Sequence, residues 1–221
     1  MLVVPAFLFS LYAQYKVKGA FSKYSNYLNS KGMTGAEMAR YILSINGIND
    51  VSVEPTRGSL TDYYDPKTKV VRLSETVFSS TSIAAIGVAA HETGHAIQHN
   101  EGYGPLALRS SMVPVAGIGS SFGPYLAIFG LFFGSNLLLD VGLILFTVAV
   151  AFYLVTLPVE FNASSRAIAI LEKSALFSDE EIKPVKKVLS SAAMTYVASA
   201  AVAMANLLRL LLLANSRRRN D

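Results

Sequence analysis

The sequence contains no cysteine, so it can form neither a disulfide bond nor a metal site built on thiolates. Any metal ion held by its side chains must be bound by histidine, aspartate or glutamate. Histidine is also scarce, with three in 221 residues, and all three lie between His91 and His99. Because a random scatter would not cluster them in this way, this stretch is the first candidate for a functional site.

Charged residues are few as well, at 15%, against about a quarter in a typical soluble domain. Hydrophobic residues reach 52% and are concentrated in long runs, which indicates membrane-spanning helices. The net charge of +4 is modest, and three of the positive charges belong to the C-terminal stretch 217–219. We therefore predict a protein that lies in the lipid bilayer and does not bind nucleic acid.

The histidine cluster opens with the pentapeptide HETGH at positions 91–95, which has the form H-E-x-x-H. The surrounding stretch, about 82–99, can form a helix, and residues four apart share one face of a helix. His91 and His95 can therefore bind a single metal ion, and Glu92 can reach a water held by that ion, as in zinc peptidases. The alternative interpretation is a helix that carries two surface histidines.

Two further residues of this helix follow from its geometry. Gly94 lacks a side chain between the two histidines, so another element can approach the helix closely there. His99 lies two turns from His91, about 12 Å along the axis, so it cannot bind the same ion while the helix stays regular. We interpret His99 as a residue beside the site or at the end of the helix.

Two apolar runs, 113–134 and 137–158, each have the length of a membrane-spanning helix, about 20 residues. Asp140 is their only charged residue, and the connection between them is short, so they predict a transmembrane hairpin. The apolar stretch 1–15 is predicted to anchor the N-terminus, with a buried or interfacial helix as the alternative. The run 192–214 is long enough to span the membrane, or else packs against the protein or the membrane surface.

Glu160 follows the predicted hairpin directly. Since a hairpin returns the chain to the side of the membrane that it left, Glu160 should lie on the same side as His91 and His95. It is therefore our candidate for the third metal ligand. The alternative is an acidic residue that complements the dipole at the start of a helix after Pro158.

Two residues after Glu160 are candidates for supporting roles. Ser164 lies one helical turn further on and can hydrogen-bond a ligand histidine. Arg166 can pair with a carboxylate or stabilise negative charge that develops during a reaction. An ordinary surface salt bridge is the alternative for Arg166.

The polar section before the hairpin is nearly neutral, like a soluble domain. A capping box at 34–37 predicts a helix, and 51–54 and 69–73 predict short strands on either side of a turn-rich loop. The chain thus divides into six segments of alternating character. They are an N-terminal membrane anchor (1–15), the first part of a peptidase domain (16–112), a transmembrane hairpin (113–158), the second part of that domain with the third ligand (159–191), a C-terminal apolar helix (192–214) and a basic tail (215–221).

Three stretches resemble the YugP-type membrane neutral zinc metallopeptidases: HETGHAIQH at 91–99, LTDYYDPKTKVVRLS at 60–74 and LPVEFNAS at 157–164. The resemblance covers nearly the whole chain. That family is similar in layout to the HtpX and CAAX prenyl protease group of gluzincins, whose third ligand is a glutamate in an E-x-x-x-D pattern. Here the residue four positions after Glu160 is Ser164, so the second carboxylate of that wider group is missing from this position.

The resemblance implies a mainly α-helical membrane protein. In it, a gluzincin-like zinc peptidase domain with a small β-hairpin or sheet is attached to three or four transmembrane helices. It also implies a multi-pass protein of the cell membrane that cleaves polypeptides, including membrane or misfolded proteins in quality control. The positive charges after the N-terminal stretch favour a site on the cytoplasmic side.

From the residues we predict that His91, His95 and Glu160 bind one Zn²⁺ ion and that Glu92 is the general base for a zinc-activated water. One competing hypothesis is an intramembrane protease, but the charged surroundings of the motif argue against it. Another is a non-catalytic membrane adaptor with a structural or vestigial metal site. The presence of Glu92 speaks against this adaptor, because a structural site needs ligands but no base.

Overall fold

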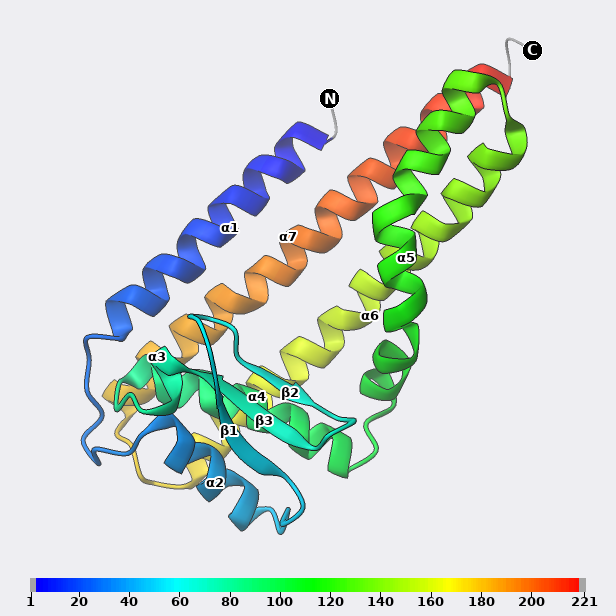
Figure 1. Ribbon diagram of the computed structural model, residues 1–221. Coiled ribbons are helices and arrows are strands. Elements are labelled where there is room, and N and C mark those ends of the chain that lie inside the picture. Colours follow the sequence, from blue (N-terminus) through cyan, green and yellow to red (C-terminus); the bar gives the residue numbers. More distant parts are fainter. Residues whose placement is uncertain (1–2, 219–221) are drawn as a thin grey trace. The chain divides into compact units, whose positions relative to one another are not determined.

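The structure, a computed structural model, describes residues 3–218 (Figure 1). Residues 1–2 of the predicted anchor and 219–221 of the predicted basic tail lie outside the described residues. The described chain divides into two compact units, each assembled from separate segments. The helical unit comprises 3–13, 107–158 and 195–218, and the mixed unit, which contains the sheet, comprises 14–106 and 159–194.

The described residues form mainly helices, with one small sheet. The helices are α1 (Val3–Tyr24), α2 (Gly35–Ile45), α3 (Glu75–Phe78), α4 (Ile83–Asn100), α5 (Gly104–Phe133), α6 (Asn136–Lys173) and α7 (Asp179–Arg218). The strands are β1 (Ser52–Thr56), β2 (Tyr63–Asp65) and β3 (Val70–Ser74).

Two helices of the mixed unit begin where side-chain caps predict. At α2 the hydroxyl of Thr34 accepts a hydrogen bond from the backbone N–H of Glu37 (3.2 Å), and the Glu37 carboxylate accepts one from the backbone N–H of Thr34 (2.8 Å). At α4 the Ser82 hydroxyl accepts a hydrogen bond from the N–H of Ala85 (3.2 Å). These bonds satisfy N–H groups that lack partners in the first turn of a helix. The predicted capping box and the predicted helix over about 82–99 are confirmed.

The predicted small sheet has three strands, in the order β1-β3-β2. The two predicted strands correspond to β1 and β3, which run parallel, with Ser52 opposite Val70. The hairpin is formed by β2 and β3, which are antiparallel, and β2 lies inside the turn-rich loop predicted between the strands 51–54 and 69–73. A strand of three residues is too short to show the alternation by which strands are recognised.

Helix α4 lies in the middle of the mixed unit, packed against α2 and α3 and in contact with β2 and β3 (Figure 1). The core around it includes Met38 and Ile42 of α2, Leu73 of β3 and Val185 of α7, all almost fully buried. Burying an aliphatic side chain of this size contributes about 1.5–3 kcal/mol. Since α4 is buried along nearly its whole length, each of its polar side chains must find a partner inside the protein.

In the helical unit, glycines let α5 and α6 approach closely. A Cβ atom added at Gly119, Gly123 or Gly130 of α5, or at Gly142 of α6, would collide with backbone atoms of the facing helix. Such small-residue contacts are typical of helices packed in lipid. At the end of α5, the guanidinium group of Arg217 donates hydrogen bonds to the carbonyls of residues 130 (2.7 Å) and 131 (3.3 Å), which have no partner within the helix.

Within residues 3–218, three helices are long and apolar enough to cross a membrane: α5, α6 and α7. The stretch 1–15 continues as α1 to Tyr24, and α1 is not among these three. Two boundaries of the predicted segments fall inside helices, because α6 continues through Pro158 to Lys173 and α7 (Asp179–Arg218) runs through position 192. The protein is therefore mainly helical, with a three-stranded sheet and three candidate membrane spans.

Candidate metal centre

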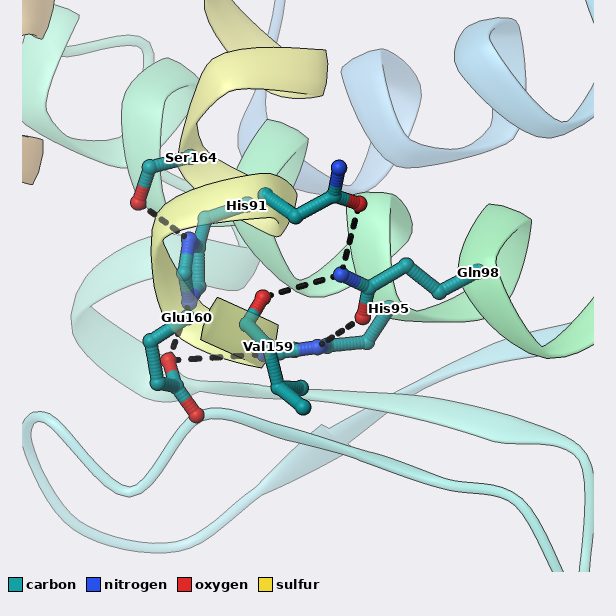
Figure 2. Close-up of polar contacts among 7 residues, drawn as sticks. His91, His95, Gln98, Val159, Glu160 and Ser164 are labelled. Carbon is teal, nitrogen blue, oxygen red and sulfur yellow. Dashed lines mark hydrogen bonds and ion pairs between the residues drawn. The ribbon is translucent and has the colours of Figure 1, made fainter. Parts of the chain in front are cut away.

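His91 and His95 lie one turn apart on α4, and the structure brings Glu160 of α6 to the same point (Figure 2). The carboxylate Oε2 of Glu160 lies 3.1 Å from His91 Nε2 and 3.6 Å from His95 Nε2. One possible ligand atom from each of the three residues lies within 4.8 Å of the other two. Side chains separated by 69 residues of sequence thus form one compact cluster.

Gly94 explains how α6 can come so close to α4. A Cβ atom at this position would lie 2.8 Å from the backbone carbonyl oxygen of Ala163, which is far inside normal contact. Ala163 is three residues after Glu160, so the carboxylate and the close contact belong to the same turn of α6. The expectation that Gly94 admits a neighbouring element is confirmed.

The remaining nitrogen of each imidazole has a polar partner of its own. Ser164 Oγ lies 3.1 Å from His91 Nδ1, and Gln98 Oε1 lies 3.0 Å from His95 Nδ1 (Figure 2). Both Nε2 atoms are thereby directed at Glu160. Metal-binding histidines characteristically have one nitrogen held by a hydrogen bond and the other turned to the ion.

The three side chains fit a zinc ion by their chemistry. Two imidazole nitrogens and one carboxylate oxygen form the set of protein ligands that catalytic zinc sites use, with a fourth position open for water or substrate. Glu160 is 2% exposed, and a buried carboxylate requires compensating positive charge. A divalent cation between these residues would supply that charge.

Burial also shapes the protonation of the neighbouring groups. Burial raises the pKa of Glu92, and the nearby His91 and His95 only partly oppose it. Burial works against protonation of His95, but the negative charge of the nearby Glu160 carboxylate outweighs this and raises the pKa of His95. Glu92 is thus a buried acid or base next to the cluster, with a proton affinity above that of an ordinary glutamate.

His99 lies apart from the cluster, as its spacing predicts. Its Nδ1 atom is 2.7 Å from the hydroxyl of Tyr64 on β2, and burial raises the pKa of Tyr64 to about 12, so the phenol keeps its proton. His99 also lines a cavity of about 170 Å³, together with residues from β2, the end of α4 and the stretch before β1. It therefore links α4 to the sheet.

Arg166 is held by two acceptors. Its Nε donates to Asn162 Oδ1 at 2.7 Å, and its Nη1 lies 2.7 Å from the carboxylate of Glu101. Because the Glu101 side chain is 52% exposed, this contact is the surface salt bridge that was the alternative interpretation of Arg166. Gln98 and Asn162 were not predicted to take part in the site. The available signal was the position of Gln98, three residues after His95 and so on the same face of the helix.

Comparison with known proteins agrees with this geometry. Residues 1–215 match the family described as "Putative neutral zinc metallopeptidase". The chain is also 52% identical over 212 residues, 96% of its length and 94% of the relative's, to a protein of Bacillus subtilis (strain 168) named "Putative membrane protease YugP". No solved structure matches. The chain, with two histidines and a glutamate gathered at one point, belongs to the neutral zinc metallopeptidase family.

Proposed function

We propose that the protein is a membrane-bound, zinc-dependent metalloendopeptidase in which His91, His95 and Glu160 hold the ion and Glu92 is the general base. The convergence of these three ligands beside a buried glutamate carries the proposal. Membership of a zinc peptidase family supports it independently.

Each residue then has a defined task. Zinc, when bound, polarises the scissile carbonyl group and lowers the pKa of a water molecule. Glu92 takes a proton from the attacking water as the water oxygen bonds to the carbonyl carbon. It delivers that proton to the amide nitrogen as the carbon–nitrogen bond breaks. The raised pKa of Glu92 favours this exchange, because it makes the carboxylate a stronger base toward the attacking water.

We further propose that the substrates are membrane or misfolded polypeptides met at the bilayer, and that the site faces the cytoplasm. The three candidate spans support a multi-pass protein. The lysines that follow the N-terminal apolar stretch, Lys16, Lys18 and Lys23, support a cytoplasmic location for the mixed unit.

The cysteine-free sequence makes this orientation testable. A single cysteine at exposed Lys67 of the mixed unit and another at exposed Asn136, beside the turn between α5 and α6, can be labelled in intact cells. A membrane-impermeant maleimide should react with Asn136→Cys and leave Lys67→Cys unlabelled until the cells are opened. The reverse pattern would place the site outside the cytoplasm.

Glu92→Gln is the decisive variant for the activity. It keeps the size of the side chain and removes the base, so zinc should stay bound while cleavage of an unfolded model protein falls by at least about a hundredfold. Glu75→Gln, an exposed glutamate of the same unit, is the matched control and should cleave like the wild type. Equal cleavage by wild type and Glu92→Gln would contradict the proposal.

The second hypothesis is a non-catalytic membrane adaptor with a structural zinc ion. It predicts that His91→Ala and Glu160→Ala lower zinc content and stability, while no variant changes a cleavage rate. Zinc content that is unchanged in Glu160→Ala would remove this residue from the ligand set under either hypothesis.

A further inference from the structure

Gln98 is fully buried, and its side-chain amide makes three hydrogen bonds (Figure 2). Its Nε2 donates to the backbone carbonyl of Val159 and to Asn162 Oδ1, both at 2.9 Å. Its Oε1 lies 3.0 Å from His95 Nδ1. One side chain of α4 thus connects a histidine of the cluster to the residue that precedes Glu160.

The partners determine which way the amide points. A backbone carbonyl only accepts hydrogen bonds, and Asn162 Oδ1 is already identified as an acceptor because Arg166 Nε donates to it at 2.7 Å. Both must therefore face the NH₂ group of Gln98, which leaves its oxygen toward His95. The contact between Arg166 and Glu101 holds the outer end of this chain of hydrogen bonds at 2.7 Å.

The orientation of the amide in turn fixes the histidine. Because Gln98 Oε1 can only accept, His95 Nδ1 must carry the proton and donate it. In a neutral imidazole ring the other nitrogen, Nε2, then presents its lone pair, and this is the nitrogen that faces Glu160. The partner of His91 does not impose this choice, since the Ser164 hydroxyl can donate or accept.

We propose that Gln98 is a positioning residue of the metal centre: it holds His95 with Nδ1 protonated and Nε2 available to the ion, and Asn162 and Arg166 hold Gln98 in the orientation that does so. The inference rests on the proposed function, because it assumes that the cluster binds zinc. It assigns a role to residues outside the H-E-x-x-H motif and the third ligand.

The test measures zinc affinity by competition with a chelating dye, in a Glu92→Gln parent that cannot digest itself. Gln98→Met keeps the length of the side chain and removes the acceptor. The loss of this acceptor should leave His95 Nδ1 without its hydrogen-bond partner, whereas Asn162 Oδ1 still accepts a hydrogen bond from Arg166. Zinc binding should weaken by about 10–100-fold, while the melting temperature of the metal-free protein stays close to that of the parent.

Two further variants separate positioning from packing. Gln98→Glu keeps an acceptor for His95 but sets its second oxygen against the Val159 carbonyl and Asn162 Oδ1, so it should lose less zinc affinity than Gln98→Met while its metal-free form melts at a lower temperature. Gln14→Met replaces the chain's other glutamine, which is exposed, and should bind zinc like the parent. Zinc affinity unchanged in Gln98→Met, or lowered equally in Gln98→Met and Gln98→Glu, would overturn the inference.

The outcomes also distinguish this inference from the proposed function. If the Glu92→Gln parent binds zinc but the wild type cleaves no polypeptide, the peptidase proposal is overturned and the role of Gln98 stands. A parent that binds no zinc would overturn both.

Discussion

Gly94→Ala tests whether the closeness of α4 and α6 builds the metal centre. The added Cβ would lie 2.8 Å from the carbonyl oxygen of Ala163 and 3.3 Å from the Ala163 carbonyl carbon and Cα. These are backbone atoms of a helix, so no side-chain rotation can relieve the contact. The two helices must separate by about half an ångström to restore a normal distance.

Two opposing terms set the effect on stability. Replacing glycine by alanine inside a helix stabilises it by about 1 kcal/mol. Overpacking a well-packed core costs about 1–3 kcal/mol. We therefore expect the free energy of unfolding of the metal-free protein to fall by up to about 2 kcal/mol.

The effect on the metal centre should be larger than the effect on stability. Glu160 lies on the same turn of α6 as Ala163, so a displaced α6 carries the carboxylate away from His91 and His95. Binding sites tolerate displacements of only about 0.5 Å. Zinc affinity should therefore fall by at least about tenfold, measured by chelator competition alongside thermal unfolding in detergent.

Gly87→Ala is the matched control on the same helix. Its Cβ would meet a side-chain methyl group, Val185 Cγ1, at 3.2 Å, instead of a backbone carbonyl. It gains the same helix propensity and lies about one turn before His91. If Gly94→Ala binds zinc as tightly as Gly87→Ala and melts no lower, the close contact does not build the site and the reasoning fails.

Four other outcomes are expected. Ser164→Ala should weaken zinc binding up to about tenfold by removing the partner of a ligand histidine, while the exposed neighbour Ser165→Ala should leave zinc titrations unchanged. Gly130→Ala should lower the melting temperature in detergent through its clash with α6, whereas Gly117→Ala, which meets open space, should not. Thr34→Ala should cost about 1 kcal/mol in chemical denaturation, and an unchanged midpoint would show that the capping box is dispensable. Stripping zinc with a chelator should lower the melting temperature, and the loss should reverse as zinc is added back in increasing amounts.

The sequence determined those features that depend on neighbours along the chain. The capping box before α2 and the cap of α4 are local hydrogen bonds, and the one-turn spacing of His91 and His95 follows from helix geometry alone. The apolar runs identified candidate spans, because crossing a bilayer requires length and composition and no particular partner. Counting spans was also enough to expect Glu160 on the same side as the histidines, where the structure brings it to them.

Only the tertiary structure decided the features that depend on how distant segments pack. The three-residue strand β2 exists because β3 pairs with it, and its own sequence carries too little alternation to predict it. Ser164 reaches His91, and Val159 and Asn162 orient Gln98, only because two helices lie close together whose contact residues are 61–73 positions apart. No local sequence pattern encodes the distance between α4 and α6. That distance is set by the backbone carbonyl of Ala163, which occupies the space that a side chain at Gly94 would fill.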